Sequence, residues 1–361
     1  MSGFSRLYHG QTRIEFVGRA KRFFTVSTAV IVVGLGSLSF RGLNLGIDFK
    51  GGTAWEMEAT GLSVHDVEAA VQGAGAPQPT VYILGGKTVH VEADLNGLNA
   101  TEQTSTENAV ADALGKLGHK SANQVSISTI GPTWGGEITH KALLALIVFF
   151  VAVVLYISVR FEPKMAIAAL VAMAHDLLVT VGVYSIFGFQ ITPDTVIALL
   201  TILGYSLYDT VVVFDRVRDN AKGILSQGNM TYSDMVNLSM NQTLARSLNT
   251  SLVAVIPVLS VLLVGAELLG ATTLREYGLA LFVGLLSGAY SSIFIAAPLL
   301  AILKEREPRM KVLSQRLANR ADRSVMSATE AAAARGAERG LVGATGGAGV
   351  IQPRGRKQKR R

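Results

Sequence analysis

An aspartate inside an apolar segment is the residue of this chain best suited to carry chemistry. Asp209 lies within GYSLYDTVVVFDRVRDN (204–220), where apolar residues surround it until a run of charge closes the segment. A carboxylate at the centre of a membrane-spanning helix costs about 2.5 to 3.5 kcal/mol on insertion scales. Ionisable groups in such positions usually belong to a proton or ion pathway and have a partner on a neighbouring helix. The sequence therefore predicts a proton-coupling site at Asp209.

The nearest candidate partner in the sequence is Arg246, in LARSLNTSL at the start of the next apolar segment. An embedded ion pair would hold the Asp209 carboxyl close to a protonation switch, because the guanidinium keeps its charge. In the alternative, Arg246 lies at the membrane boundary and its side chain simply reaches the lipid headgroups. The sequence leaves both arrangements open.

A second polar pair, His175 and Asp176, lies near the middle of the apolar stretch 165–187. A lone histidine there is more often a packing residue, whereas a carboxylate at that depth has few innocuous partners. Asp176 is therefore a candidate for a proton relay, with a structural role as the alternative. Asp215 and Arg216 lie close to the membrane boundary and are expected to anchor the helix and form a local ion pair.

Small polar residues in the same apolar segments can donate hydrogen bonds inside a helix bundle, although they commonly serve only to pack helices. They are Thr210, Asn249, Thr250, Ser251, Ser291 and Ser292.

These residues need a membrane bundle to position them, and the composition predicts one. Of 361 residues, 49% are hydrophobic and only 16% are charged, which is typical of the membrane class. Apolar runs are long enough, or nearly so, to span the hydrocarbon core, which needs about 20 residues of helix. They lie near 23–40, 141–159, 165–187, 194–214, 248–265 and 278–302. The first run is taken as a retained helix, the alternative being a cleaved signal peptide.

The distribution of lysine and arginine predicts the orientation. Basic residues precede the first apolar run, fill the link between the second and third, and follow the fourth, so these segments and both termini are expected in the cytoplasm. Residues 1–22 are then a cytoplasmic N-terminus. The acidic segment 41–140 lies outside, and 141–303 form a five-helix bundle in the membrane. Residues 215–247 are expected to run along the membrane surface.

The C-terminal segment 304–361 carries 15 basic and 5 acidic residues, against a net charge of +7 for the whole chain. Its glycine and alanine content and its lack of apolar periodicity predict a disordered cytoplasmic tail. The end, RGRKQKRR, could contact anionic lipid or the ribosome through charge alone. A solvated tail that only enforces topology is the equal alternative.

Residues 41–140 are numerous enough to fold by themselves, and their pattern alternates between strand and helix. Strands are expected at 53–59 and 124–130, and a hairpin at 81–93 around Gly85 and Gly86. Helices are expected after Ser63, which can cap the first of them, and over 101–118. The order βαββαβ predicts a ferredoxin-like α+β domain between the first and second spanning helices.

Motifs for enzymatic chemistry are weak or missing in the sequence. GGKT (85–88) matches the end of a phosphate-binding loop, but Val81 stands where that loop requires glycine. The chain has no cysteine, which excludes disulfides and thiolate metal sites, and its six histidines are scattered. We expect neither an enzyme, nor a cofactor, nor a metal site.

Five motifs together resemble the SecF proteins of the SecD/SecF protein-export family. They are GIDFKGGT (46–53), AHD (174–176), GYSLYDTVVVFDRVRDN (204–220), ARSLNTSL (245–252) and GAYSSIFIAAPLL (288–300). The resemblance covers roughly residues 20–303. Tyr208 is a departure, because the family commonly has asparagine there.

The resemblance implies a role beside the Sec translocon (SecY, SecE and SecG), as a partner of SecD that uses the proton-motive force to draw secreted polypeptides across the cytoplasmic membrane of a bacterium. In the family, an aspartate and an arginine tied to proton passage fall on Asp209 and Arg246. The family's glycine motif falls on Asp48, Gly51 and Gly52 and implies a joint between helix and outer domain.

Two other functions are compatible with the residues alone. The chain could be half of a proton-coupled exporter of lipids or hydrophobic small molecules, of the resistance-nodulation-division type. It could also be a passive scaffold of the translocon, in which Asp209 and Arg246 are structural.

Overall fold

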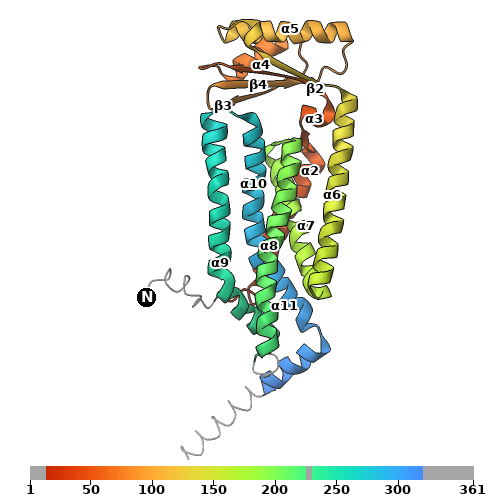
Figure 1. Cartoon of the computed structure of the whole chain (residues 1–361), viewed down its shortest axis with the longest axis vertical. Coiled ribbons are helices and arrows are strands. Elements are labelled where there is room, and N and C mark those ends of the chain that lie inside the picture. Colours follow the sequence, from red (N-terminus) through yellow and green to blue (C-terminus); the bar gives the residue numbers. More distant parts are fainter. Residues whose placement is uncertain (1–13, 225–229, 320–361) are drawn as a thin grey trace, which may run out of the picture.

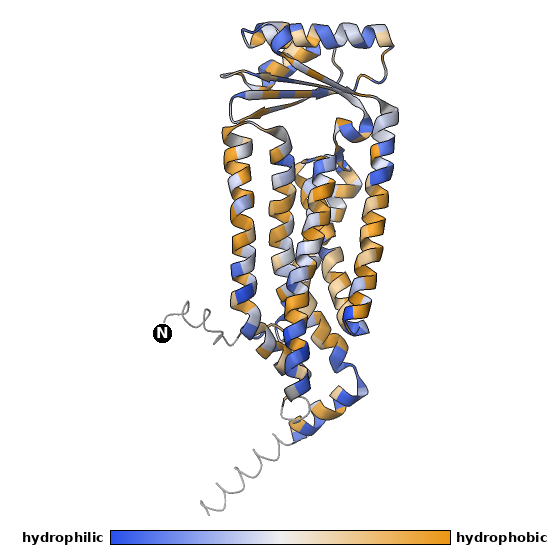
Figure 2. Cartoon of the chain, in the orientation of Figure 1, coloured by the Kyte–Doolittle hydropathy of each residue, from blue (hydrophilic) through white to orange (hydrophobic). Residues whose placement is uncertain are grey.

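The computed structural model describes residues 14–224 and 230–319. Among these residues, six helices are long and apolar enough to cross a membrane. Figure 2 shows hydrophobic residues along the middle of these helices and hydrophilic residues toward their ends. This arrangement is that of a multi-pass membrane protein.

The helices that form the bundle match the six predicted spans in order but are longer than most of the apolar runs. They are α2 (Ala20–Arg41), α6 (Pro132–Arg160), α7 (Pro163–Phe187), α8 (Pro193–Ile224), α9 (Tyr232–Ser260) and α10 (Thr272–Ser291). Helix α9 continues into a π-helical segment, η2 (Val261–Leu268). Helix α10 continues through the π-helical η3 (Ser292–Ala296) into α11 (Ala297–Glu305).

Two expectations about the helix ends differ from the structure. Most of the segment 215–247 extends helices α8 and α9, because its apolar residues, among them Val217, Met235 and Met240, pack in the main hydrophobic cluster. Residues 308–319 are helical, although they belong to the segment predicted to be disordered. The remainder of the predicted tail, from residue 320, lies outside the described residues.

A small α+β unit, here named the sheet domain (residues 52–130), lies at one end of the bundle (Figure 1). Its elements are β2 (Gly52–Glu58), α4 (Val64–Gly73), β3 (Thr80–Leu84), β4 (Thr88–Ala93), α5 (Ala100–Leu117), the 3-10 turn η1 (Ala122–Gln124) and β5 (Ser126–Ile130). The strands form one antiparallel sheet in the order β3-β4-β2-β5. Helices α4 and α5 cover the sheet face that points away from the bundle.

Local sequence explains these elements. Ser63 caps α4 by accepting a hydrogen bond of 3.2 Å from the Asp66 amide, as predicted. Gly85 and Gly86 have left-handed φ angles of 57° and 64°, which the tight β3–β4 turn requires. Trp55 and other apolar residues that alternate along β2 and β4 are buried against α4 and α5.

The joint between the bundle and the sheet domain is a short helix, α3 (Ile47–Lys50), followed by Gly51 and Gly52. Both glycines have positive φ angles, 81° and 140°. A Cβ atom at Gly52 would lie 2.8 Å from the Ala93 carbonyl oxygen, so the position has no room for a side chain. Beside the joint, β1 (Asn44–Leu45) pairs in parallel with β6 (Gln190–Ile191). The start of the sheet domain is thereby fixed to the link between α7 and α8.

Helices α2 and α7 cross in close contact at two glycines. A Cβ atom at Gly34 would lie 2.8 Å from the Cα atom of Gly182. Small residues at such crossings let helix backbones approach within a membrane. We expect Gly34→Ala to lower stability by about 1–3 kcal/mol, because backbone must move to accommodate the methyl group. Thermal unfolding in detergent measures this.

Gly36→Ala, on the same helix, is the matched control. Nothing lies within 4 Å of a Cβ atom at Gly36, so this change is expected to leave stability unchanged or slightly raised. Equal melting temperatures for the two variants would contradict the proposed tight crossing.

Candidate functional site

Asp209 lies on α8 inside the bundle and is only 3% exposed. The Ser247 hydroxyl on α9 donates a hydrogen bond of 2.8 Å to its Oδ1 atom. Its Oδ2 atom is buried and has no hydrogen-bond partner among the described residues. The carboxyl group therefore has a single donor in a site where an incompletely hydrogen-bonded charge is costly.

Arg246 does not form an ion pair with Asp209 in the described part of the chain. Its side chain is exposed, whereas its neighbour Ser247 is buried and faces the carboxyl. Consecutive residues of a helix point in different directions, so α9 can present only one of the two to Asp209. Arg246 therefore lies at the periphery of the bundle and not in an embedded ion pair.

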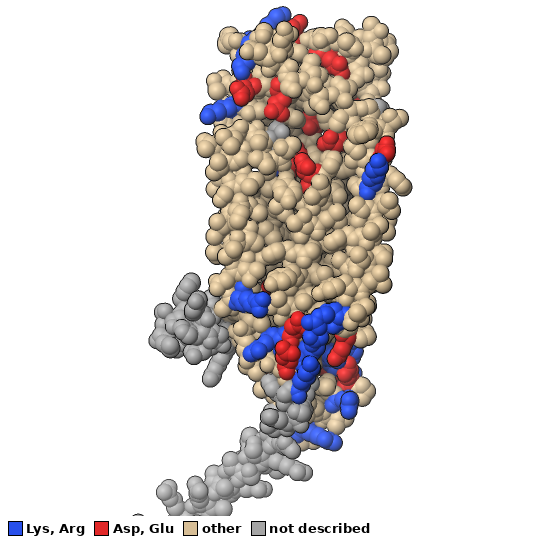
Figure 3. Space-filling model, in the orientation of Figure 1, with Lys and Arg blue, Asp and Glu red and all other residues tan. Residues whose placement is uncertain are grey.

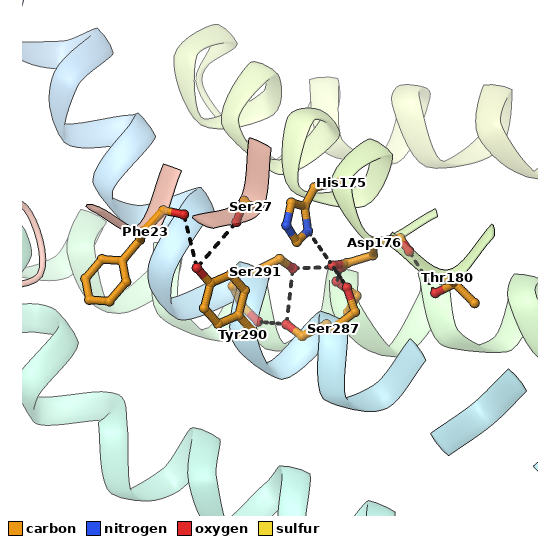
Figure 4. A network of polar contacts seen from close by, with 11 residues as sticks. Phe23, Ser27, His175, Asp176, Thr180, Ser287, Tyr290 and Ser291 are labelled. Atoms are coloured by element: carbon orange, nitrogen blue, oxygen red, sulfur yellow. Dashed lines mark hydrogen bonds and ion pairs between the residues drawn. The ribbon is translucent and has the colours of Figure 1, made fainter. Parts of the chain in front are cut away.

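Asp176 on α7 has the opposite environment and is the centre of a hydrogen-bond network (Figure 4). Its Oδ2 atom accepts hydrogen bonds from Ser206 on α8 at 2.5 Å and from Ser291 on α10 at 2.7 Å. Its Oδ1 atom accepts one from Ser287 on α10 at 2.8 Å and lies 3.1 Å from Nδ1 of His175. Asp176 is 1% exposed, and its contacts connect three helices.

The sequence around Ser287 and Ser291 explains why α10 can approach α8 so closely. Gly284 and Gly288 lie on the same helix, and Cβ atoms there would meet Ile202 at 2.2 Å and Ser206 at 3.0 Å, both on α8. Small residues at i and i+4 give a surface on which another helix backbone can lie. The serines are thereby brought within hydrogen-bond distance of Asp176.

His175 belongs to the same network and connects it to α2. Its ring stacks on that of Tyr290 at a centroid distance of 6.0 Å. The Tyr290 hydroxyl donates to the Phe23 carbonyl oxygen at 3.2 Å and accepts from Ser27 at 3.4 Å (Figure 4). His175 is buried, and it both packs against Tyr290 and contacts Asp176.

Asp176 and Asp209 are connected through one face of helix α8. Ser206, which donates to Asp176, precedes Asp209 by one turn of α8, so the two side chains lie on the same helix face. The π-helical turn η3 begins directly after Ser291. Such irregular turns are frequent at functional sites. Here Pro298 in α11 has no amide hydrogen, so it cannot donate the backbone hydrogen bond of a regular helix.

Asp215 and Arg216 lie near the end of the bundle opposite to the sheet domain, but they do not pair with each other. Asp215 forms ion pairs with Arg160 at 3.0 Å and Arg218 at 2.9 Å. Arg216 instead donates to Gln242 at 2.7 Å. The predicted local ion pair of Asp215 thus exists with different arginines, because Arg218, one turn further on, is on the same face of α8.

Asp48, in the joint helix α3, lies at the opposite end of the bundle, where the sheet domain meets it. Burial, and then the charges of Glu92 and Asp194, raises the pKa of Asp48 above its usual range. Figure 3 shows acidic side chains gathered at this junction, with an almost uncharged band below it. Asp48 and the ion pairs of Asp215 therefore lie at opposite ends of the bundle.

Reasoning from sequence missed most of the donors in these sites. Ser291 was expected to donate within the bundle, but Ser206, Ser247 and Ser287 were not. Ser206 lies one turn before Asp209, and Ser287 one turn before Ser291, so the signal was a serine at helical spacing from a polar residue already selected. Among the described residues, no group of acidic residues and histidines suits a metal ion.

The chain matches two sequence profiles of one family. Residues 109–306 match the one described as "Protein export membrane protein SecD/SecF, C-terminal", and residues 36–59 match the "SecD/SecF GG Motif". The "Protein translocase subunit SecF" of Mycobacterium tuberculosis (strain CDC 1551 / Oshkosh) is 42% identical over 362 residues, which cover 97% of this chain and 82% of that protein. The chain belongs to the SecD/SecF family of protein-export membrane proteins.

Other members of the SecD/SecF family agree. The SecF subunit of Streptomyces coelicolor is 42% identical and aligns with 88% of this chain and 84% of its own length. The "Protein translocase subunit SecDF" of Bacillus subtilis is 36% identical, and the chain spans 38% of it. The named relatives are translocase subunits, which is consistent with an accessory role in Sec export without an enzymatic reaction.

Solved SecDF structures share the fold. The crystal structure of SecDF from Thermus thermophilus has a TM-score of 0.71 at 30% identity, and the alignment covers 82% of this chain and 39% of that one. A SecDF structure in the "Super-membrane-facing form" has a TM-score of 0.59 over the same shares of the two chains. The chain is thus similar to part of SecDF, and its role is that of an accessory subunit in Sec protein export.

Proposed function

We propose that this chain works with SecD beside the SecY, SecE and SecG translocon and uses the proton-motive force to promote export of polypeptides. Relatives in Bacillus and Thermus that are named SecDF support SecD as the partner. The observation that carries the proton role is the environment of Asp209, a buried carboxyl with one donor and one oxygen without a partner.

The contacts favour a division of labour between the two buried aspartates. Asp176 has three serine donors and a histidine contact, so its charge is compensated in place and it holds α7, α8 and α10 together. Asp209 lacks such compensation, and binding a proton would remove its uncompensated charge. Arg246, one residue from Ser247, would act on Asp209 when α9 rotates.

We also propose that the sheet domain is a ferredoxin-like domain on the extracytoplasmic side. The element order βαββαβ and the strand order β3-β4-β2-β5 support the fold assignment. Basic residues at the opposite end of the bundle support the orientation, with that end and both termini in the cytoplasm (Figure 3). They include Arg160, Lys164, Arg216, Arg218 and Lys304.

The joint would transmit movement between bundle and sheet domain. The domain is held to the bundle by α3 with Gly51 and Gly52, by the β1–β6 pair, and by α6, which follows β5 directly. A change of helix packing around Asp209 would therefore displace the sheet, whose outer strand β5 pairs on one side only and could bind an extended polypeptide.

Proton influx into vesicles is the test. The chain and SecD are reconstituted together in vesicles, oriented so that the sheet domain lies on the acidic side. These vesicles are expected to admit protons when a membrane potential and a pH gradient are imposed. Internal pH is followed with a dye, and vesicles without protein are the control. Influx equal to that of the protein-free vesicles would contradict the proposal.

A further inference from the structure

A chain of titratable side chains crosses the sheet domain toward the bundle, and the sites described above do not use it. Glu56 on β2, with a side chain that is 46% exposed, lies 3.4 Å from Nδ1 of His90 on β4. Nε2 of His90 lies 3.0 Å from Glu92, whose other oxygen accepts a hydrogen bond of 2.5 Å from Gln190 on β6. The contacts run without a break from solvent to the end of the bundle.

His90 is the central member of this chain. The antiparallel register places it opposite Glu56 on β2, and Glu92 follows two residues later on the same face of β4. The side chains of His90 and Glu92 are only 14% and 12% exposed, so Glu56 is the most solvent-exposed of the three. An imidazole with a carboxylate at each nitrogen has the geometry of a proton shuttle.

A cavity lies beside Gln190, the residue that donates to Glu92. It has a volume of about 150 Å³, enough for several water molecules, and Gln190 and Glu276 are among its lining residues. Gln190 is 7% exposed, and its Oε1 atom has no hydrogen-bond partner among the described residues. A buried amide oxygen of this kind is usually hydrogen-bonded to water.

Polar side chains lead from this cavity into the bundle along one face of α7. Tyr184 lines the cavity, and its hydroxyl donates to the Glu276 carbonyl oxygen at 3.3 Å. Thr180 and Asp176 follow at successive turns of the same helix, and Thr180 is 1% exposed. The buried network around Asp176 and Asp209 thus lies below the cavity.

We propose that His90 is a proton-transfer residue, which passes protons from Glu56 at the surface of the sheet domain to Glu92 and the cavity at the bundle. This inference rests on the proposed proton-coupled function and on the extracytoplasmic position of the sheet domain. It makes the domain part of the proton pathway, in addition to any part it has in holding the exported chain.

The transfer uses only the protons of these three side chains. Protonated Glu56 gives its proton to Nδ1 of neutral His90, and the imidazolium gives its Nε2 proton to the Glu92 carboxylate. Glu56 is then ionised, Glu92 is protonated, and His90 is neutral with its hydrogen on Nδ1. Rotation of the neutral ring about its Cβ–Cγ bond turns the remaining N–H back toward Glu92, so the ring resets without returning a proton to Glu56.

The charges around His90 support this role. Burial lowers the pKa of His90, but the hydrogen bonds and charges of Glu92 and Glu56 outweigh it, so the pKa lies above its usual range. Other titratable or charged side chains lie at this junction on the adjacent elements. They are Asp48 on α3, Tyr82 on β3, Asp194 on α8, and Arg275 and Glu276 on α10.

The test uses the full chain with SecD in vesicles that have the sheet domain on the acidic side. His90→Ala is expected to slow proton influx by about 100-fold, the order contributed by a positioned acid–base group. Imidazole added on the acidic side should restore much of the influx, because it can occupy the vacated space and carry protons. His90→Gln, which keeps hydrogen bonding but cannot be protonated, is expected to be as slow.

The control is His65→Ala, on α4 of the same domain, where the side chain is 92% exposed. It should leave influx unchanged. Wild-type influx in both His90 variants would overturn the proposal. It would also be overturned if His90→Ala is slow and not rescued by imidazole while His90→Gln has normal influx. If the wild-type protein admits no protons, the proposed function fails as well. If Asp209→Asn blocks influx and the His90 variants do not, only the role of His90 fails.

Discussion

Asp209→Asn is expected to reduce proton influx by about 100-fold or more while the protein stays inserted and bound to SecD. Asparagine has almost the same shape as aspartate and can still accept the hydrogen bond from Ser247, so packing is conserved. It cannot take up or release a proton. Export that depends on the proton-motive force should be lost together with influx, and both can be measured in vesicles.

Asp215→Asn is the matched control for this prediction. The residue lies on the same helix, but it is paired with Arg160 and Arg218 at the end of the bundle and is partly exposed. Its replacement should leave proton influx near the wild-type rate, because pairs near the surface contribute little. Unchanged influx in Asp209→Asn would refute a proton role for this carboxyl group.

Asp176→Ala is expected to destabilise the bundle by about 3–5 kcal/mol, the cost of removing one partner from a buried charged network. The three serine hydroxyls and the His175 nitrogen would lose their acceptor inside the protein. Asp176→Asn should cost less, because one oxygen still accepts and serine hydroxyls can rotate to accept from the amide. Thermal unfolding of the complex with SecD in detergent measures both.

Asp219→Ala is the control for stability, because Asp219 is exposed on α8. A change within about 0.5 kcal/mol is expected there. If Asp176→Ala melts at the temperature of the control, Asp176 does not hold the three helices together, and its role would have to be sought in proton relay instead.

The membrane helices and the sheet domain illustrate what local sequence can predict. Apolar runs gave the order of the six helices, and alternation with turn residues placed the elements of the sheet domain, since both patterns depend on neighbouring residues. The helix ends were harder to predict. Helix α6 starts at Pro132, before its apolar run, because polar residues can extend a helix beyond the membrane.

The partners of the buried aspartates depend on helix rotation, which a single sequence does not reveal. Charge suggested Arg246 for Asp209, but the rotation of α9 presents Ser247. The donors of Asp176 come from α8 and α10, up to 115 positions away. Close packing at Gly284 and Gly288 brings them together, and no local pattern encodes that distance.

The protonation state of the two buried aspartates tests the central proposal most directly. Infrared difference spectroscopy of the complex with SecD, recorded on acidifying the side that carries the sheet domain, detects the carbonyl band of a newly protonated carboxyl group. We predict that one component of this band disappears in Asp209→Asn and persists in Asp176→Asn. A band that persists in Asp209→Asn and disappears in Asp176→Asn would contradict the assignment of the proton to Asp209.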